Sequence, residues 1–272
     1  MRLKHLLFAG LTLAVMAGAV VPASAAACGG DFGSWLADFK RDAAAAGIPA
    51  GTIASALSGV TPDPAVLKLD RNQRYFKQSF ETYRAKRVPP GKVESGIQKL
   101  KASASLFKRI EAKFGVPGPV LVAIWGLETG FGAGSGNTPS IRSLATLAHD
   151  CRRSDFFQNE LIAALQIVQH GDLTPSTMRG GWAGELGQTQ FLPSSYVKFA
   201  VDFDGDGRRD LIHSYADALA STANYLKGYG WQAGKPWEEG TANFAVLTGW
   251  NKAEVYRRTI VYFAKLMADG MH

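Results

Sequence analysis

Glu128 is the carboxyl whose sequence surroundings best suit acid catalysis. It ends the apolar segment 123–128 (AIWGLE), and a glycine-rich segment, 130–138 (GFGAGSGNT), follows it. A carboxyl at the edge of an apolar helix loses hydration, and its pKa rises because the charged form is disfavoured. A carboxyl that stays protonated near neutral pH can donate its proton to a leaving oxygen. The alternative is a glutamate at a helix end that points into solvent.

A second segment carries amides among glycines. Gln188 and Gln190 lie in 181–196 (GWAGELGQTQFLPSSY). Glycines let the backbone and neighbouring amides approach a polyhydroxylated ligand closely. Phe131, Trp182 and Phe191 could stack on sugar faces, although packing in the core is an equally good explanation for each. This pattern indicates a carbohydrate site.

An acidic loop supplies a different chemistry, that of a hard cation. Residues 202–207 (DFDGDG) match the start of an EF-hand loop, with oxygen ligands at positions 1, 3 and 5 from Asp202, Asp204 and Asp206. Arg208, at position 7, would offer its backbone carbonyl. Position 12 is His213 instead of a bidentate glutamate, so the loop is not a standard sensor. We expect a structural Ca²⁺ site; a solvated acidic turn is the alternative.

The elements that would position these residues are helices. Phe32, Trp35, Leu36 and Phe39 recur at helical spacing. The pattern predicts helices over 32–46, 48–59, 65–70, 92–114, 120–128, 140–148, 155–169, 216–228 and 252–268. Pro119 suits a first helical turn, and the segment 88–91 (VPPG) reads as an internal linker. Strand signals are few and short, so the predicted fold is mainly α.

The first 25 residues have the pattern of a secretory signal peptide. Arg2 and Lys4 precede the apolar run 6–21, and Ala-Ser-Ala at 23–25 resembles a cleavage site. A membrane anchor is the alternative, but the unbroken run is short of the ~20 residues that span a bilayer. Lipoprotein anchoring at Cys28 is not expected, because the leucine usual three residues before the cysteine is missing. We therefore expect a periplasmic protein.

Export bears on the cysteines and on the charge. Cys28 and Cys151 are the two cysteines, and an oxidising compartment favours a structural disulfide between them. The formal net charge is +7, and removal of Arg2 and Lys4 leaves 7 − 2 = +5. A basic surface favours polyanionic partners. For an exported protein nucleic acid is not expected, whereas the carboxylates of the cell wall fit.

Four strings together carry a family resemblance. They are 123–132 (AIWGLETGFG), 181–196, 201–210 (VDFDGDGRRD) and 218–231 (ALASTANYLKGYGW). In this order and spacing the chain resembles the membrane-bound lytic murein transglycosylase B family of the lysozyme-like superfamily, glycoside hydrolase family 103. The resemblance runs from about Trp35 to the C-terminus. It implies a catalytic domain over 28–272, with a helical N-terminal part (28–90), a lysozyme-like core (91–272) and a small calcium-loop insertion.

The resemblance also implies roles for individual residues. Glu128 matches the catalytic acid/base, Asn251 an asparagine near it, and Gln190 a glutamine that contacts the sugar. Tyr225 and Tyr256 match tyrosines lining the active site; we include Gln188 with these substrate-binding candidates. Asp217 matches the aspartate that closes the calcium loop, with Asp210 as the fallback. Family members often have serine where this chain has Gly181, so a hydroxyl contact to substrate is in doubt.

The implied reaction is non-hydrolytic cleavage of the MurNAc–GlcNAc β-1,4 bond of peptidoglycan, which leaves a 1,6-anhydro-MurNAc end. Ordinary glycosidases use two carboxylates, and Glu185 is the one candidate for a second carboxyl. A hydrolytic muramidase and a catalytically silent peptidoglycan-binding protein are the alternatives. We expect a monomer without an organic cofactor, acting on glycan strands, with cell-wall synthesis proteins as possible partners.

Overall fold

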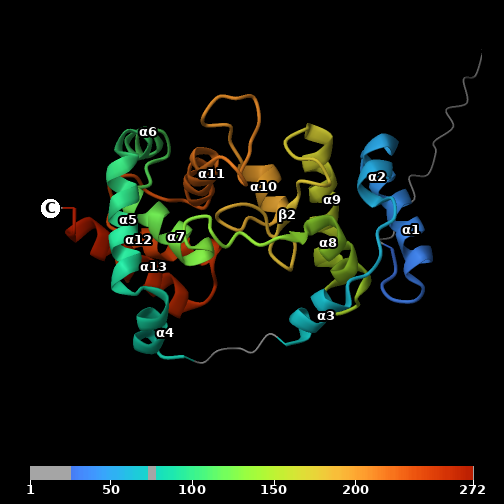
Figure 1. The fold of residues 1–272 in the computed structure, drawn as a ribbon, viewed down its shortest axis with the longest axis horizontal. Coiled ribbons are helices and arrows are strands. Elements are labelled where there is room, and N and C mark those ends of the chain that lie inside the picture. The colour runs from blue at the N-terminus through green and yellow to red at the C-terminus, as the bar shows by residue number, and fades with distance from the viewer. Residues whose placement is uncertain (1–25, 73–77, 272) are drawn as a thin grey trace, which may run out of the picture.

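The computed structural model describes residues 26–72 and 78–271. Within these ranges the chain forms thirteen α-helices and one antiparallel sheet of two short strands (Figure 1). The prediction of a mainly α fold is confirmed. The predicted signal peptide, 1–25, lies outside the described residues.

The helices and strands follow one another along the chain with connections of varied length. Their bounds are α1 Phe32–Ala45, α2 Ala50–Leu57, α3 Pro64–Arg71, α4 Phe80–Arg87, α5 Pro90–Ala102, α6 Ala104–Phe114, α7 Gly118–Thr129, β1 Thr138–Pro139, α8 Ser140–His149, α9 Ser154–His170, β2 Arg179–Gly180, α10 Pro193–Phe199, α11 Tyr215–Gly228, α12 Ala242–Trp250 and α13 Glu254–Asp269. The two strands pair through Thr138 with Gly180 and Pro139 with Arg179.

Helix α7 is the central element of the core. Its residues 120–127 are all buried, so it has no polar face and must be covered on every side. Helices α5, α6, α11 and α13 pack around it. Gly126 permits the closest approach, because a Cβ there would lie 2.8 Å from ring carbons of Phe131 and Phe263. This packing fixes the C-terminal end of α7, where Glu128 lies.

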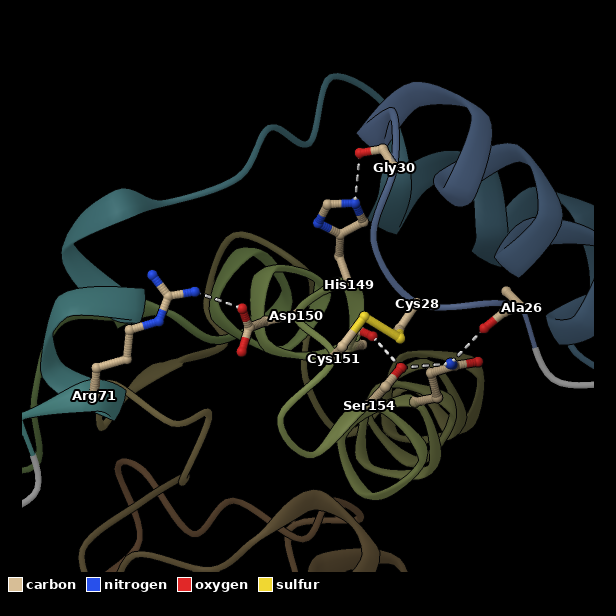
Figure 2. Close-up of a disulfide and its surroundings, with 10 residues drawn as sticks. Ala26, Cys28, Gly30, Arg71, His149, Asp150, Cys151 and Ser154 are labelled. Carbon is tan, nitrogen blue, oxygen red and sulfur yellow. Dashed lines mark hydrogen bonds and ion pairs between the residues drawn. A yellow bond between two sulfur atoms is a disulfide. The ribbon is translucent and has the colours of Figure 1, made fainter.

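The first three helices lie beside α8 and α9, at the end of the molecule away from α5 and α13 (Figure 1). Helices α1, α2 and α3 pack on α8 and α9, whereas α4 packs on α13. A disulfide joins Cys28 to Cys151, which confirms the predicted pairing (Figure 2). Beside it, His149 contacts the Gly30 carbonyl at 3.2 Å.

The structure differs from the sequence-based prediction in five helices. The helix expected over 92–114 is two, α5 and α6, separated at Ser103, where the backbone leaves helical geometry. The break lets α5 pack on α13 while α6 packs on α11. Helices α4, α10 and α12 were not predicted. Helix α4 is polar and docks through Arg84, which donates to the Tyr262 hydroxyl at 2.8 Å.

Membrane-spanning potential is limited in the part of the chain that the structure describes. No single helix there is both long and apolar enough to cross a bilayer. Helices α6 and α7 reach that length and apolarity only when taken together, and the chain bends by 107° between them.

Candidate active site

Glu128 lies where α7 leaves the core. The helix ends at Gly130, whose φ of 60° is a left-handed conformation that suits glycine. Thr129 fixes this end, because its hydroxyl donates to the Gln188 carbonyl at 2.6 Å and accepts from Gly132 N–H at 2.8 Å. Glu128, between buried Leu127 and buried Thr129, is itself partly exposed. Its carboxyl therefore stands at the boundary between core and cleft.

Two donors bind the same oxygen of this carboxyl. The Tyr256 hydroxyl donates to Glu128 Oε1 at 2.6 Å, and Trp250 Nε1 donates to the same atom at 2.9 Å. Trp250 ends α12, and Tyr256 lies in the first turns of α13. No hydrogen bond from the described residues reaches Oε2. Within the described part of the chain, the donors therefore occupy one carboxyl oxygen of Glu128 and leave the other without a partner.

Burial raises the pKa of Glu128 above that of an ordinary glutamate. The hydrogen bonds from Tyr256 and Trp250 act in the opposite direction, as does the positive charge of Arg87, because all three favour the ionised form. The negative charge of Glu185 raises the pKa of Glu128 further. The net direction is upward, which suits an acid that must hold its proton near neutral pH.

A small cleft opens beside this carboxyl. It has a volume of about 90 Å³ and is lined by Glu128, Gln190, Phe191, Leu192, Ser195, Tyr225 and Trp250. Aromatic rings form one wall, with the Trp250 ring 5.1 Å from Tyr225 and 5.6 Å from Phe191, both edge-on. Carboxyl, amide, hydroxyl and aromatic groups together are the set that binds a sugar.

Gln190 and Tyr225 are held in place by backbone carbonyls. Gln190 has a φ of 57°, which side-chain-bearing residues rarely adopt. Its Nε2 donates to the carbonyls of Ser135 at 3.0 Å and Gly187 at 2.9 Å. The Tyr225 hydroxyl donates to the Gly249 carbonyl at 2.6 Å, directly before Trp250 in the chain. Both predicted site residues therefore line the cleft in fixed orientations.

Gln188 and Asn251 do not line this cleft. Gln188 is buried; its Oε1 accepts from Trp125 Nε1 at 3.1 Å and its Nε2 donates to the Ile212 carbonyl at 3.1 Å. Asn251 Oδ1 accepts from Ala253 N–H at 2.9 Å, one residue before α13 begins. Gln188 thus links α7 to the segment before α11, whereas Asn251 makes a local turn before α13, and a contact to substrate stays a prediction for both.

Sequence reasoning missed two polar groups of the cleft, Trp250 and Ser195. Trp250 directly precedes the predicted Asn251, yet its indole N–H reaches Glu128 only because α12 and α13 meet at an angle that no local pattern reveals. Ser195 lies in the string 181–196 but carries no signal by itself. Of the other aromatics considered, Phe131 packs against Trp125 and Phe263 in the core.

Three carboxylates of the acidic loop converge. Ligand oxygens of Asp202, Asp204 and Asp217 lie within 4.8 Å of one another. Asp217 is buried at the start of α11, and burial raises the pKa of its carboxyl. Asp202 accepts the N–H groups of Gly205 at 2.7 Å and Gly207 at 2.9 Å, which curls the loop around the cluster. Converging hard oxygens suit a divalent cation.

The remaining loop residues are engaged elsewhere. Asp206 pairs with the Arg208 guanidinium at 3.6 Å, so the structure does not bring it into the three-carboxylate cluster. Asp210 accepts from the backbone of Ile212 and His213 and contacts the His213 ring at 2.8 Å. Asp217, and not the fallback Asp210, therefore completes the cluster.

Comparisons with known proteins place these features in a family. The profile of the transglycosylase SLT domain matches residues 31–240. Membrane-bound lytic murein transglycosylase B of Escherichia coli strain K12 is 37% identical over 153 residues, which are 56% of this chain and 42% of that relative. The chain thus spans less than half of the curated relative that it matches.

Solved structures agree in fold. SltB3 from Pseudomonas aeruginosa in complex with NAG-anhNAM-pentapeptide is 35% identical, with a TM-score of 0.83 over 90% of this chain and 81% of that one. The E. coli lytic transglycosylase Slt35 in complex with calcium is 26% identical, with a TM-score of 0.79 over 90% and 96%. With its lysozyme-like helical fold and a glutamate at the cleft, the chain belongs to the transglycosylase SLT domain family.

Proposed function

We propose that the protein is a lytic transglycosylase that cleaves the MurNAc–GlcNAc β-1,4 bond of peptidoglycan with Glu128 as its acid and base. The observation that carries the proposal is the state of the Glu128 carboxyl: burial raises its pKa, and both protein donors bind Oε1. A proton on the neutral carboxyl therefore belongs on Oε2, the oxygen that the donors leave open. The structure of SltB3 with a NAG-anhNAM-pentapeptide supports the substrate class.

The reaction needs no second carboxyl. Glu128 gives its proton to the glycosidic oxygen as the C1–O bond of MurNAc breaks. The new carboxylate is stabilised by the Tyr256 and Trp250 donors, which favour the charged form. It then takes the proton of the C6 hydroxyl of the same MurNAc as that oxygen bonds to C1. The product is a 1,6-anhydro ring; Glu128 regains its proton and no water is consumed.

The hydrolytic alternative requires a group that activates water. Glu185 is the candidate from sequence, but its Oε2 accepts from Ala183 N–H at 3.1 Å, and it is not among the residues that line the cleft beside Glu128. A catalytically silent binding protein would not need a carboxyl such as Glu128, whose pKa is raised by its surroundings. Gln190 and Tyr225 are proposed to bind the sugar in the cleft, and Gln188 and Asn251 remain substrate-binding candidates on the family resemblance alone.

Digestion of purified sacculi followed by mass analysis of the glycan ends tests this function. We expect 1,6-anhydro-MurNAc ends, and Glu128→Gln should reduce cleavage by at least about 10³-fold with the fold intact, since the proton donor is lost. Reducing MurNAc ends would instead establish hydrolysis. Cleavage by Glu128→Gln at the wild-type rate would remove Glu128 from the chemistry.

The acidic loop is proposed to hold a structural Ca²⁺. Asp202, Asp204 and Asp217 would supply carboxylate oxygens, with the Arg208 carbonyl as a further ligand. The fit rests on the buried Asp217, a carboxylate close to two others whose charge a cation would neutralise. The calcium complex of the related Slt35 agrees with this ion. The metal would stabilise the loop and supply no chemistry to the cleft.

Export to the periplasm is proposed from the signal-peptide pattern and from the disulfide. A disulfide persists in an oxidising compartment and is uncommon in the cytosol. The substrate is also found outside the cytoplasmic membrane. A monomer acting on glycan strands is the simplest assembly for such a chain.

A further inference from the structure

Glu185 is a second carboxyl near Glu128 that the proposed chemistry leaves without a task. It closes the turn 181–185, in which Gly181 N–H donates to the Glu185 carbonyl at 2.9 Å. The side chain is partly exposed. Burial raises the pKa of its carboxyl, against the effect of backbone N–H donors and of the Arg153 charge. The negative charge of Glu185 in turn raises the pKa of Glu128, so the two carboxyls interact electrostatically.

Gly181 lies under two oxygen atoms. A Cβ at this position would overlap Glu185 Oε2 and would lie 2.9 Å from Gln190 Oε1. The backbone at Gly181 does not require a left-handed conformation, so space and not φ demands glycine here. The absence of a side chain at 181 thus brings the Glu185 carboxylate and the Gln190 amide oxygen over one bare Cα.

In the part of the chain that the structure describes, no hydrogen bond joins the Glu185 carboxyl to the Gln190 amide oxygen. Both N–H groups of the Gln190 amide are used, one on the Ser135 carbonyl and one on the Gly187 carbonyl, which fixes Oε1 as the atom facing Gly181. Among the described residues, no donor is bonded to Gln190 Oε1, and Glu185 Oε2 accepts only backbone donors of its own turn, Ala183 N–H among them. Two facing acceptors, one of them a carboxyl, need a donor from outside the protein.

We propose that Glu185 is a substrate-binding residue, which together with Gln190 Oε1 accepts a hydrogen bond from a hydroxyl or amide N–H of a sugar in the glycan strand. The site borders the cleft through Gln190, which lines it beside Glu128. A polyhydroxylated, N-acetylated sugar offers the donors that this acceptor pair lacks. Gly181 leaves the space open into which such a donor can enter. The inference rests on the proposed glycan-cleaving function.

Binding measured apart from catalysis tests the proposal. In a Glu128→Gln background, calorimetry with a soluble, uncrosslinked peptidoglycan oligosaccharide should show Kd rising about tenfold for Glu185→Ala, the size expected for a hydrogen bond to a charged group. Gly181→Ala should weaken binding similarly, because its methyl group takes the space of the donor. Glu111→Ala, an exposed glutamate on α6, is the matched control and should leave Kd unchanged.

Kinetics separate binding from a purely structural role. With Glu128 intact, Glu185→Ala should raise KM about tenfold and leave kcat near the wild-type value. Glu185→Gln keeps the size of the side chain and an oxygen that accepts from Ala183 N–H. Its Kd should therefore lie between that of the protein with Glu185 and that of Glu185→Ala. An unchanged Kd with a lowered melting temperature would overturn the proposal. If the wild-type protein cleaves no glycan, the proposed function fails; normal cleavage with an unchanged Kd refutes only the role of Glu185.

Discussion

At the scale of single residues, the two oxygens of Glu128 have different surroundings. Oε1 accepts from Tyr256 and Trp250, while Oε2 accepts no hydrogen bond from residues 26–72 or 78–271. Burial and the Glu128 charge raise the pKa of the Tyr256 hydroxyl well above its usual range, so it stays a donor at every pH of interest. One carboxyl can thus carry its proton on Oε2 and still have its ionised form stabilised at Oε1.

Removal of the Tyr256 hydroxyl should move the pH profile of cleavage. The hydrogen bond favours ionised Glu128, so its loss in Tyr256→Phe raises the pKa of Glu128 further. Activity requires the protonated acid and falls as pH rises through that pKa. The alkaline limb of kcat/KM should therefore move to higher pH, and the maximal rate should fall about tenfold because the carboxylate loses a donor.

Tyr262→Phe is the matched control for this measurement. Tyr262 is on the same helix, and its hydroxyl contacts Arg84 instead of Glu128. Its pH profile should follow the wild type. An alkaline limb of Tyr256→Phe that stays in place, or moves to lower pH, would contradict the assigned role of this hydrogen bond.

At the scale of elements, sequence patterns located what is local and missed what depends on packing. Helix α7 was predictable because its residues 120–127 are apolar all round, and Glu128 because it ends that segment. Helices α4 and α12 were not predictable, since α4 is polar and is held through its Arg84 to Tyr262 of α13, and α12 shows no clear apolar face. Trp250 was missed with α12. Its contact with Glu128 joins residues 122 positions apart.

Packing at Gly126 gives a prediction for α7. Ala at this position brings a methyl group within 2.8 Å of Phe131 and Phe263 ring carbons, so α7 and α13 must move apart. We expect Gly126→Ala to lower the free energy of unfolding by about 1–3 kcal/mol. Denaturant unfolding measures this. Gly51→Ala, in α2 with no atom near its added methyl group, should not destabilise; equal effects would refute the packing argument.

Chelation should reveal whether the acidic loop holds a metal. If Ca²⁺ fills the cluster, a ligand at 100 times its Kd stabilises by about 2.7 kcal/mol, so EDTA should lower the melting temperature by several degrees. In Asp217→Asn this response to EDTA should vanish. Asp206→Asn should keep it, because Asp206 lies outside the three-carboxylate cluster. Identical melting curves of the wild type with and without EDTA would rule out a stabilising metal.

At the scale of the whole molecule, the site combines residues from inside and from outside the segment that the disulfide encloses, 28–151. Glu128 lies between Cys28 and Cys151, whereas Gln190, Tyr225, Trp250 and Tyr256 follow Cys151. Cleft formation thus requires long-range contacts. A division into parts at residue 90 remains a prediction; one continuous hydrophobic core extends from Ala26 to Met267.

Reduction of the disulfide should destabilise the fold. The bond joins residues 123 positions apart, and such a crosslink typically contributes about 2–4 kcal/mol, mainly by restricting the unfolded chain. For a domain of this size that corresponds to roughly 5–15 °C in melting temperature. Calorimetry with and without dithiothreitol measures it, and the Cys28→Ala, Cys151→Ala double variant should show no response. Equal melting temperatures of reduced and oxidised wild type would contradict this.

The same bond closes residues 28–151 into a covalent ring. A single protease cut anywhere inside that ring leaves one molecule of unchanged mass apart from the added water. Electrophoresis should therefore resolve two fragments only after the sample is reduced, whereas a cut beyond residue 151 separates them at once. The glutamate of the cleft and its aromatic partners would stay tethered through such a nick, so a clipped enzyme can keep its site together.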